Sequence, residues 1–166
     1  MRLFNRRVAA GLAALVAALF SLLIANANAN ASTVLFTIPI YSQHDWRCLD
    51  ADVSSATHNG TKVQVWDCNG WDNQRWTFYS DGTIRSSHDG RCLDEDVSSV
   101  THNGTKVQVW DCNGWDNQRW TLYSDGTIRS SHDGRCLDED VSSATHNGTK
   151  VQVWDCNGWN NQKWWW

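Results

Sequence analysis

The chain has 166 residues, of which 41% are hydrophobic and 19% are charged, and its formal net charge is -4 at pH 7. This length allows one small domain with a modest core and excludes two independent ones. The acidic balance disfavours nucleic acid and anionic membrane surfaces as partners, because both are themselves negatively charged.

The first 31 residues have the pattern of a secretory signal peptide. Three arginines within the first seven residues precede an almost wholly apolar run at residues 8–24. The small-residue tract at 25–31 offers several A-x-A cleavage positions, which favours cleavage over retention as a membrane anchor. Cleavage would bring the formal net charge to about -7 and leave a secreted domain at residues 32–166, with no membrane insertion afterwards.

Residues 34–41 are apolar and β-prone, and the end of this segment aligns with residues 83–85 of the next copy. We expect it to form the first strand of the first repeat and to pack against the tryptophans at residues 164–166. Pairing of the two ends would shield strand edges that otherwise invite aggregation.

Three near-identical copies of one unit make up the rest of the chain, with a period of 44 residues. Residues 47–90 recur with three substitutions as residues 91–134, and again from residue 135 onward. Any residue with a chemical role therefore has twins, so three equivalent sites are expected. The substitutions between the first two copies are Ala51 to Glu95, Ala56 to Val100 and Phe78 to Leu122.

Each copy carries one pair of cysteines at a constant spacing. The six cysteines allow about 15 pairings, but the repeat symmetry and the exported context favour bridges within repeats. Each bridge would stabilise the fold by roughly 3 kcal/mol in the chain-entropy model. A zinc site is disfavoured because no C-x-x-C pair occurs. The predicted pairs are Cys48 with Cys68, Cys92 with Cys112, and Cys136 with Cys156.

Turn pairs divide each copy into short strands and leave no helical stretch. Asn59-Gly60, Asp81-Gly82 and Asp89-Gly90 are dipeptides that accept positive φ. Short, regularly spaced strands in a threefold repeat indicate an all-β barrel or trefoil.

Alternation along the strands separates core from surface positions. Val63 and Val65 should face the core, while Gln64 and Trp66 share the outer face. By the same rule Leu49 points inward and Asp50 points outward. Trp76, Trp120 and Trp164 are expected in the core, because large aromatic side chains dominate small β cores.

The motifs of each copy resemble those of a known family. Residues 48–50 (CLD), 59–61 (NGT), 63–70 (VQVWDCNG) and 73–76 (NQRW) resemble one repeat of the ricin B-type lectin β-trefoil, also known as the family 13 carbohydrate-binding module. The Q-x-W motif recurs at residue 118 and at residue 162, and the resemblance covers everything after about residue 38.

This resemblance implies an all-β fold, a β-trefoil of three near-identical four-stranded repeats with pseudo-threefold symmetry. Six strands would close a barrel and three hairpins would cap it. The repeats are expected at about residues 38–81, 82–125 and 126–166.

The resemblance also implies carbohydrate-binding residues. The family uses an aspartate, a glutamine and an aromatic residue on one strand, and an asparagine-glutamine pair. A sugar has hydroxyl groups and an apolar C–H face, which suit a charged acceptor, an amide donor and a flat aromatic platform. The matching positions are Asp50, Gln64, Trp66, Asn73 and Gln74; Asp94, Gln108, Trp110, Asn117 and Gln118; and Asp138, Gln152, Trp154, Asn161 and Gln162.

Two points stay open at this stage. The stretch between the aspartate and the aromatic strand is about one residue longer than in the family, so Asp52 competes with Asp50 for the sugar-facing position. The tryptophans at residues 71, 115 and 159 stand where the family has small residues. They either extend the aromatic platform or pack over the barrel.

Other clusters are assigned to turns rather than to chemistry. The acidic residues Asp52, Glu95, Asp96, Glu139 and Asp140 lack EF-hand spacing, so we expect solvated turn residues rather than a calcium site. Adjacent Ser87, His88 and Asp89, with their second copy, are not a catalytic triad, because triads are defined by spatial geometry. We expect His44, His88 and His132 at wet hairpin tips rather than in a threefold metal site.

The sequence thus predicts a secreted, disulfide-bonded lectin with no enzymatic activity, no cofactor and no bound metal. It would be a monomer that recognises galactose-type sugars or plant and microbial polysaccharide at three sites. One alternative is a stand-alone carbohydrate-binding module from a glycoside hydrolase system, and another is a trefoil inhibitor or hydrolase. The three N-G-T sequons are either glycosylation acceptors or hairpin turns.

Overall fold

The computed structural model describes residues 31–142 and 144–166. The expected signal peptide falls outside this part apart from its last residue, as does the apolar run at 8–24. Within the described residues no helix is long and apolar enough to cross a membrane.

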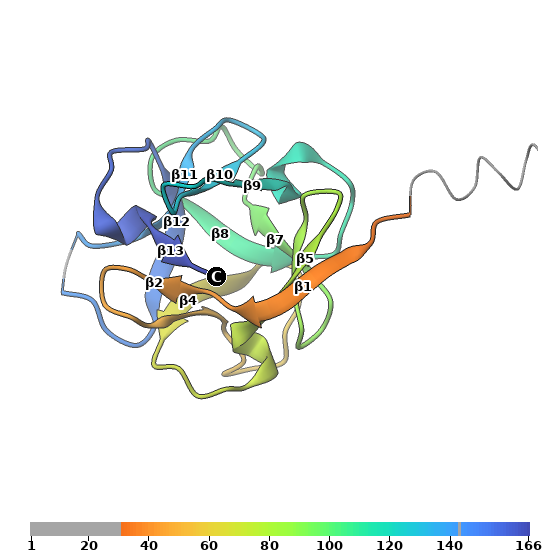
Figure 1. Cartoon of the computed structure of the whole chain (residues 1–166), viewed down its shortest axis with the longest axis horizontal. Coiled ribbons are helices and arrows are strands. Elements are labelled where there is room, and N and C mark those ends of the chain that lie inside the picture. The colour runs from red at the N-terminus through yellow and green to blue at the C-terminus, as the bar shows by residue number, and fades with distance from the viewer. Residues whose placement is uncertain (1–30, 143) are drawn as a thin grey trace, which may run out of the picture. The chain divides into compact units, whose positions relative to one another are not determined.

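Residues 33–166 form antiparallel strands that fall into three sets of four, preceded by one additional strand (Figure 1). This confirms the predicted β-trefoil. The additional strand is β1 (Val34–Pro39). The first repeat contains β2 (Tyr41–Ser42), β3 (Cys48–Ala51), β4 (Thr61–Trp66) and β5 (Arg75–Tyr79). The second contains β6 (Ile84–Ser86), β7 (Cys92–Glu95), β8 (Thr105–Trp110) and β9 (Trp120–Leu122). The third contains β10 (Ile128–Ser130), β11 (Cys136–Glu139), β12 (Thr149–Trp154) and β13 (Trp164–Trp165).

The third strands of the three repeats pair with one another in a ring. β4 pairs with β8, β8 pairs with β12, and β12 pairs with β4, in the same antiparallel register each time. Each of these strands also pairs with the preceding strand of its own repeat. The repeats are therefore joined by main-chain hydrogen bonds around a common axis.

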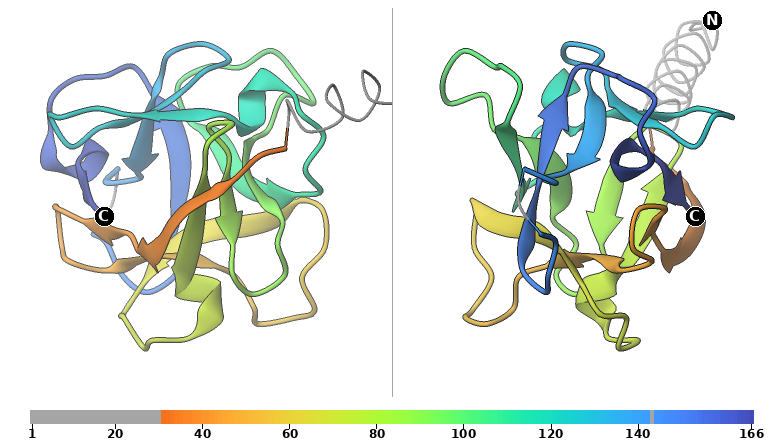
Figure 2. Two further views of the ribbon diagram at one scale, coloured as in Figure 1. Left: turned by 45° about the vertical axis from the view of Figure 1, so that its right-hand side comes forward. Right: turned by 90° about the vertical axis from the view of Figure 1, so that its left-hand side faces the viewer.

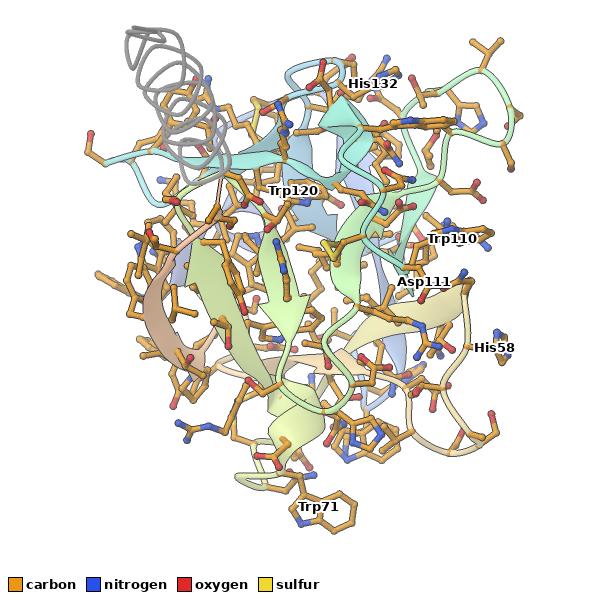
Figure 3. The ribbon with its side chains drawn as sticks, turned by 90° about the vertical axis from the view of Figure 1, so that its right-hand side faces the viewer. His58, Trp71, Trp110, Asp111, Trp120 and His132 are labelled. Carbon is orange, nitrogen blue, oxygen red and sulfur yellow. A yellow bond between two sulfur atoms is a disulfide. The ribbon has the colours of Figure 1, made fainter. Side chains whose placement is uncertain are left out.

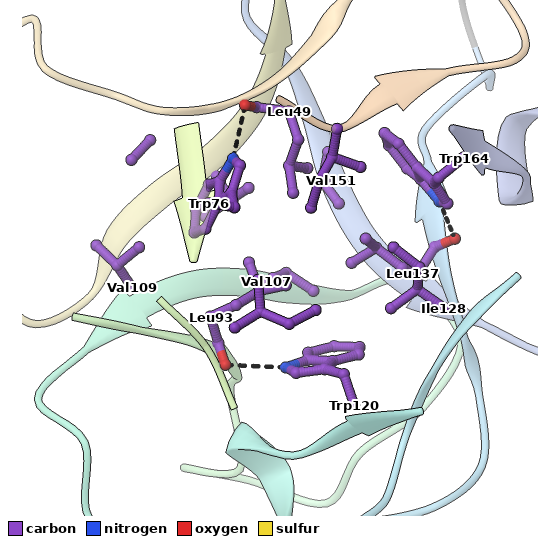
Figure 4. Packing of buried hydrophobic residues seen from close by; sticks show 14 of the residues in the cluster. Leu49, Trp76, Leu93, Val107, Val109, Trp120, Ile128, Leu137, Val151 and Trp164 are labelled. Carbon is purple, nitrogen blue, oxygen red and sulfur yellow. Dashed lines mark hydrogen bonds between the residues drawn. The ribbon is translucent and has the colours of Figure 1, made fainter. Parts of the chain in front are cut away.

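The alternation read from the sequence places the core correctly. Val63, Val65 and Leu49 are fully buried, together with their twins. Figure 4 shows the valines, leucines and tryptophans of all three repeats converging on one cluster. The symmetric core positions are Ile40, Ile84 and Ile128; Leu49, Leu93 and Leu137; Val63, Val107 and Val151; Val65, Val109 and Val153; and Trp76, Trp120 and Trp164.

The three buried tryptophans also satisfy their polar atom. The indole Nε1 of Trp76 donates to the carbonyl oxygen of Leu49 at 2.9 Å, and Trp120 and Trp164 make the same bond to Leu93 and Leu137. A buried indole N–H without an acceptor would destabilise the core. The bonds therefore fix each Q-x-W tryptophan to the strand that carries its own repeat's aspartate.

The two ends of the domain meet as a strand pair. Tyr41 and Ser42 of β2 pair with Trp165 and Trp164 of β13. Of residues 34–41, only Tyr41 lies in this strand, so the expectation is correct for that residue alone. β1 instead runs along β5, as Figure 1 and the left view of Figure 2 show. β1 thus covers the edge of β5 opposite the one that pairs with β6.

This extra strand accounts for one of the three substitutions between copies. The ring of Phe36 in β1 stacks on the ring of Phe78 in β5, with their centroids 4.5 Å apart. The twin of Phe78 is Leu122 in β9, and among the described residues β9 has no strand in the place that β1 takes beside β5. The larger side chain thus occurs where β1 supplies a surface for it.

All three predicted disulfides are present. Cys48 is bonded to Cys68, Cys92 to Cys112 and Cys136 to Cys156, each with a Cα–Cα distance of 5.2 Å. Each bridge ties the start of a β3-type strand to the segment that follows the β4-type strand. The repeat symmetry was therefore a sufficient guide to the pairing.

The asparagine of each N-G-T sequon joins two repeats. The amide of Asn59 donates to Asp111 Oδ2 at 2.9 Å, and the backbone N–H of Asp111 donates back to Asn59 Oδ1 at 2.8 Å. Arg91 Nε donates to the same Asn59 oxygen at 3.2 Å. Asn103 and Asn147 make the equivalent contacts. The structure favours the turn reading, because this amide is already occupied.

One local feature was not predicted. A single 3-10 turn precedes the Q-x-W tryptophan of each repeat: η1 (Asp72–Gln74), η2 (Asp116–Gln118) and η3 (Asn160–Gln162). The turns are too short to produce a helical periodicity in the sequence. They turn the asparagine and glutamine side chains inward toward the buried aspartate.

Trp164 should be essential for closure, because it is buried and bonds to Leu137. Trp164→Ala should lower the free energy of unfolding by about 3–5 kcal/mol. Trp165→Ala is the matched control, because Trp165 is 54% exposed, and it should cost far less. Urea denaturation measures both. Equal losses for the two variants would contradict the assignment of Trp164 to the core.

Candidate functional site

Each repeat contains one surface pocket at equivalent positions. The cavities measure about 260, 240 and 300 Å³ in the first, second and third repeats. The aspartate, glutamine, tryptophan and asparagine predicted from the sequence line all three. In the second repeat the lining residues are Asp94, Asp96, Val97, Ser98, Gln108, Trp110, Asn113, Trp115 and Asn117.

The floor of the pocket is a buried carboxylate held by three amides. Asp94 Oδ1 accepts a hydrogen bond from Gln108 Nε2 at 2.9 Å. Its Oδ2 accepts from Asn117 Nδ2 at 2.9 Å and from Gln118 Nε2 at 2.8 Å. Asp50 and Asp138 have the same three donors in their own repeats. The prediction that these aspartates point away from the core is correct, but their side chains are buried beneath the pocket surface.

Burial and hydrogen bonding act on this carboxylate in opposite directions. Burial raises the pKa of Asp94 above its ordinary value, although the three amide hydrogen bonds lower it. The pKa values of Asp50 and Asp138 are raised for the same reason. Because the amides donate to the charged form, the floor presents an oriented acceptor rather than a freely rotating acid.

The glutamine of the Q-x-W motif holds the loop around the pocket. Gln118 Nε2 donates to the carbonyl oxygen of Asp111 at 3.1 Å as well as to Asp94, and its Oε1 accepts from the backbone N–H of Asn113 at 2.8 Å. Gln118 is fully buried and is not among the pocket-lining residues. Gln74 and Gln162 make the same bonds. Direct sugar contact by these glutamines stays a prediction, and the geometry favours a positioning role.

The walls of the pocket are aromatic. Trp66, Trp110 and Trp154 at the ends of β4, β8 and β12 are 38–39% exposed. Trp71, Trp115 and Trp159 line the same pockets and are 63–64% exposed, so they do not pack over the barrel. Figure 3 shows Trp110 at the surface and Trp71 projecting away from the ribbon. Each pocket therefore offers two indoles.

The rim contains residues that the sequence left open or missed. Asp52 lies at the rim of the first pocket while Asp50 lies in the floor, so both aspartates line it. Burial raises the pKa of Asp52, but hydrogen bonds from Ser54 and the charge of Lys62 outweigh burial and hold it below its ordinary value. Val53, Ser54 and Asn69 complete the lining. No motif marked them, because their proximity arises from the loop conformation.

One acceptor in the second pocket has no partner. The side-chain oxygen Oδ1 of Asn117 is buried and receives no hydrogen bond within the described part of the chain. Its amide nitrogen is occupied by Asp94 and by the carbonyl oxygen of Glu95. This buried Oδ1 therefore lacks the hydrogen bond that buried side-chain oxygens normally receive.

The expectation that the acidic residues beside the sites are solvated is wrong for two of them. Glu95 and Glu139 are fully buried. They lie at the ends of β7 and β11 and contact the next repeat through Ser130 and Ser42. Strand alternation could not reveal this, because the residues that contact the two glutamates, Ser130 and Ser42, belong to a different repeat in each case.

The remaining sequence candidates show no catalytic geometry. Asp89 accepts hydrogen bonds from the backbone and side chain of Arg91, not from the neighbouring His88. His44, His88 and His132 are exposed at hairpin tips, and Figure 3 shows His132 at the periphery. Across residues 31–142 and 144–166, no group of three His, Cys, Asp or Glu side chains is placed to hold a metal ion.

The sequence matches the ricin-type β-trefoil lectin domain over residues 36–164, so the chain belongs to this family. It is a carbohydrate-binding domain by that membership. No protein with a curated description matches the sequence.

Three solved structures illustrate the likeness. The designed threefold symmetric protein ThreeFoil is 29% identical, with a TM-score of 0.69, over 77% of this chain and 95% of that one. A non-toxic homologue of type II RIPs from Momordica charantia (bitter gourd), in complex with α-methyl-D-galactoside, is 27% identical, with a TM-score of 0.67, over 81% of this chain and 47% of that one. The C-half of the earthworm R-type lectin, in complex with GalNAc, is 26% identical, with a TM-score of 0.60, over 77% and 95%. The chain therefore spans about half of the bitter gourd protein and nearly all of the other two.

The three amides that donate to Asp94 make it a structural residue of the pocket floor. Asp94→Ala should lower the free energy of unfolding by roughly 2–4 kcal/mol, because buried donors left without an acceptor cost about 1–3 kcal/mol. The control is Asp116→Asn, since the third repeat already has Asn160 at that position. Denaturant unfolding measures both. An Asp94→Ala variant as stable as the parent would show that the carboxylate does not hold the amides.

Proposed function

We propose that the chain is a secreted, non-enzymatic lectin that binds carbohydrate in three equivalent pockets, one per repeat. The observation that supports this most is the combination present in every pocket: exposed indoles, a buried carboxylate and side-chain amides. An indole face matches the apolar C–H face of a pyranose, and the carboxylate and amides match its hydroxyl groups.

The residues of the second pocket illustrate the proposed roles. Trp110 would stack on the sugar ring, with Trp115 as a second wall. Asp94, which lines the pocket, would accept a hydrogen bond from a ring hydroxyl. Gln108 and Gln118 would orient the carboxylate. The twins of these residues would act in the same way in the other pockets.

Galactose-type sugars are the proposed ligands. Two of the similar structures hold such sugars, α-methyl-D-galactoside in one and GalNAc in the other. A carboxylate acceptor beside an aromatic face suits vicinal hydroxyls next to an apolar ring face. Plant or microbial polysaccharide with such residues would bind by the same contacts.

Secretion and a monomeric state complete the proposal. The leader pattern at residues 1–31 supports export, and the three disulfides fit an oxidising compartment. Three sites around a pseudo-threefold axis would each bind weakly. On a polymer or a cell surface, simultaneous engagement of two would raise the avidity by about 10²-fold or more.

The valency is the decisive test. Calorimetry with methyl α-D-galactoside and with N-acetylgalactosamine should give a stoichiometry near three. Trp110→Ala should reduce it to near two without unfolding the domain, because Trp110 is partly exposed and bonds to nothing in the floor. The matched control is Trp46→Gly. Trp46 is exposed, lines none of the three pockets and has a φ of 66°, where its twins are glycines.

Two results would count against the proposal. A stoichiometry near one in the parent protein would mean that two pockets are structural only. Loss of binding in Trp46→Gly, with binding retained in Trp110→Ala, would place the sugar outside the pockets.

A further inference from the structure

A fourth cavity lies outside the three equivalent pockets. It measures about 450 Å³, which is larger than any of them, and it borders the last strand, β13. Its lining residues are Gln43, Tyr123, Ser124, Asp125, Gly126, Lys163, Trp164, Trp165 and Trp166.

The lining of this cavity coincides with departures from the repeat. Trp165 and Trp166 stand where the second copy has Thr121 and Leu122, and Lys163 stands in place of Arg119. Gln43, from the other end of the domain, replaces the serine found in the later copies. These substitutions come together because β2 pairs with β13.

The equivalent cavity between the first two repeats lacks this character. It measures about 240 Å³, and its walls include Leu35, Phe36 and Phe78. β1 covers that side of the barrel and supplies two of these residues. The fourth cavity is thus both larger and more polar than its structural twin.

The side chains of the fourth cavity have the chemistry of a sugar subsite. Trp165 and Tyr123 are 54% and 41% exposed, and the guanidinium of Arg129 lies 4.0 Å from the centroid of the Tyr123 ring. Asp125 is occupied by Thr127 and Arg129. Lys163 forms no ion pair within the described residues, so its ammonium group is available as a donor.

We propose that this cavity is an additional carbohydrate subsite that accepts one pyranose unit. Trp165 stacks on the ring, while Lys163 and Gln43 donate to its hydroxyl groups. The subsite extends the proposed lectin function but uses none of the residues of the three pockets, so the two proposals fail separately.

The test uses a variant with the three pockets disabled, Trp66→Ala/Trp110→Ala/Trp154→Ala. Galactose and glucose, added separately, are the probes, and the indole N–H resonance of Trp165 is followed by NMR. We expect at least one probe to shift this resonance in the disabled variant. Adding Trp165→Thr/Trp166→Leu, which restores the sequence of the second copy, should abolish the remaining binding, followed at the Tyr123 and Lys163 resonances.

Two outcomes would overturn the subsite. The first is a Trp165 resonance that moves with neither probe, whether or not the three pockets bind sugar. The second is a shift that follows protein concentration without sugar, which would assign the surface to contact between copies of the chain.

A second inference concerns the buried glutamates. Ser130 Oγ donates to Glu95 Oε2 at 2.6 Å, and Ser42 Oγ donates to Glu139 Oε2 at 2.5 Å. The other oxygen, Oε1, of each glutamate is buried and receives no hydrogen bond within the described chain. Each glutamate is therefore satisfied on one oxygen only.

The group that faces each glutamate is another acid. Glu95 interacts with Asp133 of the third repeat, and Glu139 interacts with Asp45 of the first. These aspartates are themselves paired with Arg135 and Arg47. Two ionised carboxylates side by side would repel, so the arrangement is satisfied when the glutamate is protonated and donates to the aspartate.

The electrostatics of the two groups agree with this geometry. Burial raises the pKa of Glu95, the hydrogen bond from Ser130 lowers it, and the neighbouring Asp133 raises it. The net effect is a pKa of about 7. The pKa of Glu139 is also raised to about 7, by burial first and by Asp45. Hydrogen bonds and the arginine charge overcome burial and lower the pKa values of Asp133 and Asp45. The shared proton thus belongs on the glutamate.

We call each contact between a glutamate position and the following repeat a joint. The joint between the first and second repeats offers a comparison, because it has no glutamate. Ala51 occupies the position of Glu95 and Glu139 in the repeat, and Ser86 and Asp89 are the counterparts of Ser130 and Asp133. This joint closes without a second acid. The glutamates are therefore not required for the β-trefoil geometry.

We propose that the Glu95–Asp133 and Glu139–Asp45 pairs are proton-sharing joints that make closure of the barrel sensitive to pH. The folded protein holds a proton on each glutamate that the unfolded chain releases above pH 4.5. The stabilisation is complete below that pH and is lost as the pH rises toward 7. Ser130, Asp133 and Arg135 surround the first glutamate, and Ser42, Asp45 and Arg47 surround the second.

The test compares melting temperatures between pH 4.5 and 8 for the parent and for Glu95→Gln/Glu139→Gln. A glutamine amide donates to the aspartate at every pH. The melting temperature of the variant should therefore fall less than that of the parent between pH 4.5 and 8. It should also melt above the parent at pH 8. The single variant Glu95→Gln should lie midway.

Parallel curves for the parent and the double variant would overturn the joints. A measurement on the parent alone keeps the proposal testable if the variants do not fold. The side-chain carboxyl ¹³C resonances of Glu95 and Glu139 should titrate near neutral pH, and titration near 4.5 would equally contradict it.

Discussion

No single repeat of this protein can bury its own apolar face, and the rest of the structure follows from that constraint. Each repeat offers a short sheet with one apolar side, so three must meet around an axis to enclose a core. The ring formed by β4, β8 and β12 does this with main-chain hydrogen bonds. The Q-x-W tryptophans fill the space inside, and each bonds to a leucine carbonyl of its own repeat. Closure of the barrel and formation of its core therefore depend on each other.

The surface pockets depend on the same closure. Trp66 of the first repeat packs against the turn at Gly148 of the third, where an added Cβ would lie 3.8 Å from the indole. Arg47 and Asp67 contact Asn147 of that turn. Each aromatic platform therefore rests on a neighbouring repeat, while the carboxylate below it belongs to its own. If the barrel were not closed, each pocket would keep its carboxylate floor but would lose the neighbouring repeat on which its tryptophan packs.

Symmetry is broken where the two ends of the domain meet and where one joint lacks a glutamate. β1 covers the edge of β5, and β2 pairs with β13, so the first and third repeats differ in what lies beside them. Trp46 takes a positive φ that its glycine twins adopt without strain. These differences give the three repeats distinct surfaces around three like pockets. The repeat alone determines the pockets, and its interruptions determine the rest of the surface.

The sequence by itself determined the β-trefoil, the disulfides, the core tryptophans and most of the pocket lining. Period and strand spacing indicated a barrel or a trefoil, and the resemblance to the ricin B-type repeat singled out the trefoil and the pocket residues. Only the tertiary structure decided that Gln118 holds the loop, that Asp52 joins the rim, that β1 pairs with β5, and that Glu95 and Glu139 are buried. Each of these depends on which segment of another repeat, or of the same loop, lies against the residue. A strand pattern records which face a side chain occupies, but not what later covers that face.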